Sequence, residues 1–317
     1  MTHKVLIATR SFGSTSHKPV KMLHNAGCDL VNADMSLEMT EERLIDLLKG
    51  VAAAIVGVVP MTAYVLENAH DLKVVSAHGV GVDHIDLVAA ARLGIAIANC
   101  PGANAASVSD LTIGLMIAIA RNIPSVDRKL RQNQWGRHQG SELFQKTLGI
   151  IGLGHIGMGV AKRAMGFDMK VLVHDPYVHS VPKELPEIQS VSFEDVLRRA
   201  DFVSLHVPLN DETRNMIGPA ELSAMKPGAY LINTARGGLV DEQALFNALT
   251  KREIAGAAFD GFVHEPPTNS PLLGLDNIVV TPHIGAHTKE SIERVGVVAA
   301  QNVINTLKGK EPLYRVK

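Results

Sequence analysis

The chain has no long hydrophobic run, only two cysteines, and a formal net charge of -1. This charge gives no electrostatic reason to expect binding to nucleic acid or to an anionic membrane surface. The apolar runs have the length of strands, and none has the length needed to cross a bilayer. The N-terminal MTHKVLIATR enters a strand-like segment at once and lacks the apolar region of a secretory signal. Cys28 and Cys100 stand apart without CxxC spacing, so we expect reduced cysteines in a cytoplasmic protein.

What the chain does contain is a short strand, a glycine turn and a helix in direct succession. The apolar residues 148–151 lead into Gly152-x-Gly154-x-x-Gly157, after which small and apolar residues recur at helical spacing. In such a turn the first glycine allows the tight bend, the second lets the backbone approach a pyrophosphate, and the third lets helix and strand pack closely. The helix N-terminus then meets the phosphate charge with free N–H groups. Asp175, at the end of the next strand, is placed to accept hydrogen bonds from a ribose 2′-hydroxyl and to repel a 2′-phosphate, which favours NAD over NADP.

Strand and helix patterns alternate on both sides of this turn, which indicates an α/β protein with two doubly wound parallel sheets. A chain of 317 residues suits two domains. Before the turn we expect strands at 5–8, 53–59, 74–75 and 95–98, and helices at 19–25, 40–49 and 105–120. After it we expect strands at 171–173, 202–207, 230–233, 255–259 and 278–281. The last helix, 288–307, should pack back on the first domain, so we predict domains at 1–100 with 286–317, and at 101–285.

Four polar side chains follow predicted strands of the second sheet, where ligands bind in open α/β sheets. They are Arg236 in LINTARGG, Asp260 and Glu265 in AFDGFVHEPP, and His283 in TPHIGAHT. An arginine offers a planar fork to a carboxylate, and a histidine backed by a carboxylate can hold or deliver a proton near neutral pH. Taken one at a time, each is also compatible with a structural or solvated role. Together they indicate hydride transfer to a 2-keto acid.

With these motifs the chain resembles the D-isomer-specific 2-hydroxyacid dehydrogenase family. The likeness runs nearly end to end, through HGVGVDHID, PGANAASVSD, IIGLGHIGMGVAKR, HDP, LHVPLNDETRNMI, INTARGGLVDEQAL, AFDGFVHEPP and TPHIGAHT. The resemblance implies a Rossmann NAD-binding domain inserted in a flavodoxin-like substrate domain. It also implies a catalytic trio in which His283 gives a proton to the substrate carbonyl, Glu265 pairs with its imidazole, and Arg236 orients the carboxylate and carbonyl.

The same resemblance implies the residues that contact NAD, mostly through their backbone, with Asp260 meeting the nicotinamide carboxamide. The implied set is Gly152, Gly154, His155, Ile156, Gly157, Asp175, Pro208, Thr234, Ala235, Asp260 and Gly285. No metal is expected, although His287 lies four residues after His283.

The implied substrate contacts lie mainly in the first domain. Val80 and Gly81 fall in the family's substrate loop, where successive N–H groups can form a nest for a carboxylate, and Asn104 begins the helix that follows. His78 stands in the same loop. Trp135, the only tryptophan, matches a segment that reaches the partner subunit in relatives. It is therefore expected either to contact substrate in a homodimer or to fill a subunit interface.

The family resemblance leaves the substrate open. A D-3-phosphoglycerate dehydrogenase usually carries an arginine at the position of Ala77, which weakens that assignment here. A glyoxylate or hydroxypyruvate reductase is a further alternative, and both act on small 2-hydroxy or 2-keto acids. A non-enzymatic alternative is an NAD-sensing scaffold like the transcriptional corepressors built on this fold.

Overall fold

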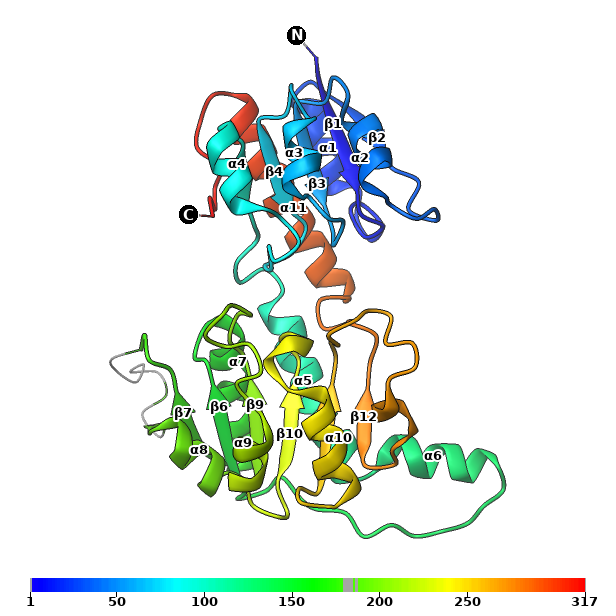
Figure 1. Cartoon of the computed structure of the whole chain (residues 1–317), viewed down its shortest axis with the longest axis vertical. Helices are drawn as coiled ribbons and strands as arrows, with labels where there is room; N and C mark the ends of the chain where they lie inside the picture. The colour runs from blue at the N-terminus through cyan, green and yellow to red at the C-terminus, as the bar shows by residue number, and fades with distance from the viewer. Residues whose placement is uncertain (1, 179–184, 186–187, 317) are drawn as a thin grey trace. The chain divides into compact units, whose positions relative to one another are not determined.

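The structure is a computed structural model that describes residues 2–178, 185 and 188–316, and the chain forms two compact units. Unit 1 comprises Met1–Asn104 with Ala286–Lys317, and unit 2 comprises Ala105–Gly285. The colours of Figure 1 show this arrangement, because the blue start and the red end of the chain share one unit and the green to yellow middle forms the other.

Unit 1 is built on a parallel sheet of five strands in the order β2-β1-β3-β4-β5, which is the flavodoxin-like order. All four residues of β3 and of β4 are buried, as expected for central strands of a parallel sheet that helices cover on both faces. The strands are β1 (His3–Ala8), β2 (Cys28–Asn32), β3 (Ala53–Val56), β4 (Val74–Ala77) and β5 (Ala96–Ala98). The first four helices are α1 (Lys18–Asn25), α2 (Glu41–Leu48), α3 (Ala63–Glu67) and α4 (Leu87–Leu93).

The last helix, α11 (Lys289–Leu307), belongs to unit 1. Thr288 is the N-cap of this helix, and its side chain accepts a hydrogen bond from Ser291 N at 3.2 Å. Its buried face includes Val295, Ala299 and Val303, and it packs beside α1 and against β3, β4 and β5. A chain that leaves this sheet after β5 therefore comes back to complete its helical layer.

Unit 2 is built on a parallel sheet of seven strands in the order β12-β11-β10-β9-β6-β7-β8. Reading outward from β6, the chain first builds one side through β7 and β8 and then crosses to build the other side through β9 to β12. This is the Rossmann arrangement, and its topological switch point lies between β6 and β9. The strands are β6 (Thr147–Ile151), β7 (Lys170–His174), β8 (Gln189–Ser190), β9 (Phe202–Leu205), β10 (Tyr230–Asn233), β11 (Gly256–Phe259) and β12 (Ile278–Val280).

Helices cover both faces of the second sheet. The apolar helix α5 packs closely on α7 and against β10, β11 and β12, and its buried residues include Ile113, Met116 and Ile119. Gly159 of α7 faces the side chain of Ser109 so closely that a Cβ there would meet its hydroxyl, which explains how the two helices approach. The helices are α5 (Ala105–Ala120), α6 (Ile123–Arg131), α7 (His155–Ala164), α8 (Phe193–Arg199), α9 (Pro219–Ala224) and α10 (Glu242–Thr250).

The fold class predicted from the sequence is confirmed, and the differences concern element ends and edges. The predicted strands 53–59 and 202–207 end at Val56 and Leu205, because the residues beyond them leave the sheet and enter loops. The edge strands β2 and β8 were not predicted, since CDLVN and the two residues of β8 carry little apolar pattern.

No single described helix is both long and apolar enough to cross a membrane. Helices α5 and α6 meet that test only as a pair, with a bend of 62° at the break between them. More than half of α5 is buried inside unit 2, so its apolar character is explained by packing in the protein core.

Candidate active site

The glycine turn between β6 and α7 has the backbone geometry that its sequence predicts. Gly152 has a φ of 95°, a left-handed conformation that favours glycine, and a Cβ there would lie 2.7 Å from His206 O. A Cβ at Gly157 would collide with the carbonyl oxygen of Gly152, so the third glycine lets the helix start against the turn. A Cβ at Gly154 would meet no protein atom within 4 Å. The second glycine therefore faces open space, where a diphosphate can reach the backbone.

The first turn of α7 supplies donors toward that space. The N–H groups of His155, Ile156 and Gly157 precede the helical hydrogen-bond ladder, so they are available to an anion. Asp175 lies beside the turn, because its Oδ2 accepts a hydrogen bond from Leu153 N at 2.7 Å and its Oδ1 accepts one from Tyr177 N at 2.9 Å. A small hollow lined by Leu153, Val173, Asp175, Val178 and Ser190 adjoins this carboxylate. The residues present thus fit a dinucleotide with an adenosine ribose at Asp175.

The other predicted cofactor residues lie at the carboxyl ends of β9, β10 and β12. Pro208 is exposed after β9, and Ala235 N donates to Asn233 Oδ1 at 3.1 Å. The Thr234 hydroxyl lies 2.9 Å from Thr112 Oγ1, which itself donates to Val108 O at 2.8 Å. Because that proton of Thr112 is already used, Thr234 is the donor between the two hydroxyls. These three strands are parallel to β6 in one sheet, so these residues lie at the same edge as the glycine turn that follows β6.

His206 is a polar residue at the topological switch point that was not predicted from the sequence as a site residue. Its Nε2 lies 2.9 Å from Ser204 Oγ, and its Nδ1 is buried with no partner among the described residues. Burial lowers the pKa of His206 to about 3, so the imidazole is neutral at physiological pH. The sequence LHVPL does not by itself predict a functional role for this histidine. Only the position of the residue after β9 shows that it lies beside the glycine turn.

Asp260 organises the segment that carries the predicted catalytic histidine. This residue follows β11, is 2% exposed, and accepts three hydrogen bonds. Its Oδ1 accepts from Thr281 Oγ1 at 2.6 Å and from Ile284 N at 2.8 Å, and its Oδ2 accepts from Gly285 N at 2.7 Å. One buried carboxylate therefore fixes both ends of the 281–285 loop, with His283 at its centre in a left-handed conformation at φ 52°.

His283 and Glu265 form a hydrogen-bonded pair. The Nδ1 of His283 lies 3.0 Å from Oε1 and 2.9 Å from Oε2 of Glu265, and Oε1 also accepts from Phe262 N at 3.1 Å. Burial raises the pKa of Glu265, but its hydrogen bond with His283 and nearby positive charge outweigh burial and hold the pKa below its usual value. The bond to Glu265 raises the pKa of His283 above its usual value, although burial acts against it. Since an ionised carboxylate only accepts, Nδ1 carries a proton and Nε2 is the atom left for a ligand.

Arg236 completes the predicted trio. It lies after β10, is half-buried, and donates from Nη1 to Ala235 O at 2.8 Å. Its positive charge lowers the pKa of both Glu265 and His283, which places the guanidinium within electrostatic reach of the pair. The structure thus brings Arg236, Glu265, His283 and Asp260 together at the carboxyl edge of the unit 2 sheet.

Hydrogen bonds orient the loop of unit 1 that contains the predicted carboxylate nest. The carbonyl of Gly79 accepts from Cys100 N at 2.8 Å, and that of Val80 accepts from Asn99 Nδ2 at 2.8 Å. In a trans peptide the N–H points opposite to the carbonyl, so the N–H groups of Val80 and Gly81 both point away from β5. No described residue accepts a hydrogen bond from either of them. Two adjacent donors on one side of a loop can hold an anionic oxygen.

His78 occupies an enclosed position in the same loop of unit 1. Its Nδ1 lies 3.1 Å from Ser11 Oγ, its ring meets Phe12 edge-on, and its Nε2 is buried without a partner in the described part of the chain. Burial, with a smaller contribution from the charge of His287, lowers the pKa of His78 to about 4. The imidazole is therefore a neutral polar group. Asn104, the last residue of the first segment of unit 1, likewise has a buried Oδ1 for which no described residue is a partner.

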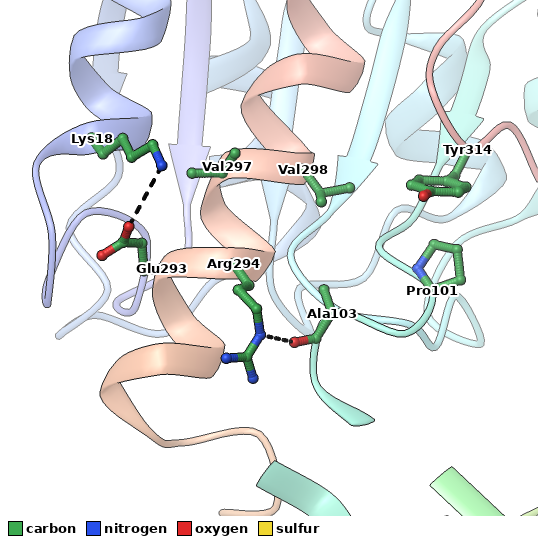
Figure 2. Close-up of a pocket in the computed structure, with 8 residues that line it drawn as sticks. All are labelled: Lys18, Pro101, Ala103, Glu293, Arg294, Val297, Val298 and Tyr314. Carbon is green, nitrogen blue, oxygen red and sulfur yellow. Dashed lines mark hydrogen bonds and ion pairs between the residues drawn. The ribbon is translucent and has the colours of Figure 1, made fainter. Parts of the chain in front are cut away.

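Two further features of the surface lie outside these clusters. Trp135 is 83% exposed in the segment after α6, which Figure 1 shows as a loop that returns along the lower side of unit 2 toward β6. A hollow of about 330 Å³ lies on unit 1, with Arg294 Nε donating to Ala103 O at 2.9 Å inside it (Figure 2). It is lined by Lys18, Pro101, Ala103, Glu293, Arg294, Val297, Val298 and Tyr314, and it contains no residue predicted to bind substrate or cofactor.

The sequence of the chain is similar to a family model and to several known proteins. A family model described as the NAD binding domain of D-isomer specific 2-hydroxyacid dehydrogenases matches residues 113–285. The D-3-phosphoglycerate dehydrogenase of Methanocaldococcus jannaschii is 42% identical over 298 residues, which cover 92% of this chain and 56% of that protein. The hydroxypyruvate reductase of Thermotoga maritima is 40% identical over 282 residues, which cover 86% of this chain and 91% of that protein.

A solved structure shows the same architecture over the whole length. The crystal structure of the TT0316 protein from Thermus thermophilus has a TM-score of 0.89 and 37% sequence identity, and the match covers 99% of this chain and 100% of that one. This chain spans little more than half the length of the phosphoglycerate dehydrogenase and nearly all of the reductase.

The His283–Glu265 pair makes a prediction that needs no substrate. In wild-type protein the imidazole of His283 should titrate above its usual pKa, and Glu265→Gln should lower that pKa, because the amide removes the charge that stabilises the imidazolium. Histidine ¹⁵N chemical shifts followed by NMR against pH measure this directly. A raised histidine pKa stabilises the folded state below the unfolded pKa, and this stabilisation is lost as pH rises through the folded value. An unchanged titration in Glu265→Gln would contradict the pairing.

Proposed function

The chain belongs to the D-isomer specific 2-hydroxyacid dehydrogenase family, and we propose that it transfers a hydride between NAD and a D-2-hydroxy acid or the matching 2-keto acid. The observation that carries this proposal is the His283–Glu265 pair within electrostatic reach of Arg236, on the sheet edge that also holds the glycine turn. When bound, the nicotinamide supplies or accepts the hydride. The side chains of the protein supply the proton and hold the acid.

His283 is the proton donor in the direction of reduction. Its Nδ1–H is held by Glu265, so Nε2 is the ring atom that can give a proton to the carbonyl oxygen of a keto acid. The negative charge of Glu265 favours the imidazolium, which keeps His283 protonated to a higher pH than an isolated histidine. In the direction of oxidation the neutral imidazole takes the same proton back. The paired carboxylate also fixes the ring in the tautomer that both steps need.

Arg236 binds the carboxylate that every 2-keto acid carries next to its reacting carbonyl. A guanidinium can donate two parallel hydrogen bonds to a carboxylate, and this sets the direction in which the neighbouring carbonyl points. Its permanent positive charge also stabilises negative charge that develops on the carbonyl oxygen. The N–H groups of Val80 and Gly81 are a second candidate site for an anionic oxygen of the substrate.

Within the family we propose that the substrate is a small acid without a phosphate group. Ala77 is 1% exposed and packs in the core of unit 1, so the loop has no cation at this position. Arg92 forms an ion pair with Glu67, so its guanidinium is already engaged by a carboxylate. His78 is neutral because burial lowers its pKa to about 4. D-3-phosphoglycerate remains the alternative substrate, and direct rate measurements distinguish the two.

Steady-state rates test the reaction and its substrate together. With NADH, hydroxypyruvate or glyoxylate should be reduced faster than 3-phosphohydroxypyruvate, and His283→Ala should lower turnover by about 10²–10⁴-fold because the proton donor is lost. NAD binding, measured by calorimetry, should stay nearly unchanged in that variant. A preference for the phosphorylated acid would overturn the substrate proposal. No turnover of any acid, combined with NAD-dependent binding of a partner protein, would favour a sensing scaffold.

Asp175 should determine the preference for NAD over NADP. Replacing it with serine removes the charge that repels a 2′-phosphate, so kcat/KM with NADP should rise at least about tenfold relative to NAD, corresponding to about 1.4 kcal/mol. Asp168, an exposed residue of the same unit that lies before β7, provides a matched control as Asp168→Ser. The ratio of kcat/KM values with the two cofactors is the measurement. An unchanged ratio in Asp175→Ser would remove this carboxylate from cofactor recognition.

We propose a homodimer that is located in the cytoplasm. The segment from α6 onward supports the dimer, and the cysteines support the location. It exposes Ile123 at 46%, Leu130 at 55% and Trp135 at 83%, a set of large apolar side chains that a partner subunit would cover. Cys28 and Cys100 are buried and unbridged, as in a reducing compartment.

Light scattering coupled to size exclusion tests the dimer. The wild-type chain should elute with twice its 34.0 kDa mass, and the double variant Leu130→Asp/Trp135→Asp should elute as a monomer because it places charge in the interface. Tyr177→Asp, at a residue that is 79% exposed, is the control and should remain dimeric. A double variant that stays dimeric would place the interface elsewhere.

A further inference from the structure

Asn233 is a buried amide whose side chain hydrogen-bonds to the loop that follows it. It is the last residue of β10 and is 0% exposed. Its Nδ2 donates to Arg236 O at 2.8 Å, and its Oδ1 accepts from Ala235 N at 3.1 Å. A buried amide left unpaired destabilises the folded state, so these two bonds lock the loop to the end of the strand. One bond ends on the main chain of Arg236, the residue that carries the guanidinium, and the other on the main chain of Ala235.

The main chain of Asn233 connects this loop to the neighbouring strand end. Its carbonyl oxygen accepts from Asp260 N at 2.9 Å. Asp260 is the residue whose carboxylate holds the 281–285 loop and therefore His283. The position of Arg236 is thus tied, through Asn233 and Asp260, to the position of the histidine.

The other side of Arg236 is fixed by close backbone packing. Gly237 is buried, and a Cβ on it would collide with the backbone of Phe262 and Val263. The next residues of that segment lead to Glu265, whose Oε1 accepts from Phe262 N at 3.1 Å. The main chain around Arg236 is therefore held on one side by the side-chain amide of Asn233 and on the other by the close contact of Gly237 with Phe262 and Val263.

We propose that Asn233 is a positioning residue that holds the main chain of Arg236 so that its guanidinium meets the substrate carboxylate in register with His283. This rests on the proposed function, because it assigns to Arg236 the carboxylate of a 2-keto acid. A paired guanidinium–carboxylate contact is directional, and a displacement of about 1 Å at such a site can cost about 10²-fold in rate. Asn233 itself touches no ligand in this role.

The test uses Asn233→Ser, which removes the donor to Arg236 O without adding charge. The Michaelis constant for the keto acid should rise by about tenfold or more, with NAD affinity within twofold of wild type. Asn277→Ser is the matched control, since Asn277 in the same unit also holds a loop by Nδ2, to Leu249 O at 3.1 Å, but lies before β12 at the opposite end of the strands. It should leave the Michaelis constant unchanged. If Asn233→Ser does not fold, Asn233→Asp keeps the volume of the side chain and loses the same donor.

A double-mutant cycle with Arg236→Ala separates positioning from a general loss of structure. If Asn233 acts through Arg236, Asn233→Ser should change kcat/KM by less than twofold in the Arg236→Ala background. Persistence of its full effect there would overturn the proposal. So would wild-type kinetics in both Asn233 variants.

A second readout does not depend on turnover. The charge of Arg236 lowers the pKa of His283, so a displaced guanidinium should let the His283 titration move upward in Asn233→Ser but not in Asn277→Ser. An unmoved titration in Asn233→Ser would count against positioning. If the wild-type enzyme turns over no keto acid, the proposed function fails, and the titration still decides whether Asn233 places Arg236.

Discussion

The carboxylate of Asp260 is the constraint on which the rest of the site depends. A buried carboxylate is tolerated only when its oxygens are hydrogen-bonded, and here a hydroxyl and two N–H groups from one short loop satisfy them. If the loop moved away, the buried carboxylate would lose all three of these hydrogen bonds. Because the loop contains His283 and the main chain of Asp260 bonds to Asn233, three strand ends are held in one arrangement. The side chains of Arg236 and His283 then project from a fixed frame.

Much of this frame could be predicted from the sequence because it is encoded locally. The strand, glycine turn and helix around Gly152 follow from three glycines and two hydrophobic periods within a single stretch. The convergence of Arg236, Glu265 and His283 was predictable as well, because parallel strands end at a common edge and each residue closely follows such a strand. The last helix was assigned to the first unit from a simple count of strands already needed by the second.

What could not be predicted depends on partners that are distant in the sequence. Asn233 reads as an ordinary strand residue in LINTARGG, and only its two bonds to the following loop reveal its use. His206 follows β9 and lies next to the glycine turn, which precedes it by some fifty residues in the sequence. The two are neighbours because β9 pairs with β6 in the sheet. The edge strands β2 and β8 are short and partly polar, so neither has the apolar run that marks a central strand. Pairing with a neighbour defines them.

The backbone of His283 has a consequence for how this protein can change. At φ 52° the residue occupies a conformation that glycine or asparagine adopts more readily, and a side chain held there costs of order 1 kcal/mol. Glycine at this position would relieve the backbone but would leave the carboxylate of Glu265 without its imidazole partner. These two effects oppose each other, so in a lineage that abandons the chemistry the residues at positions 265 and 283 should change together.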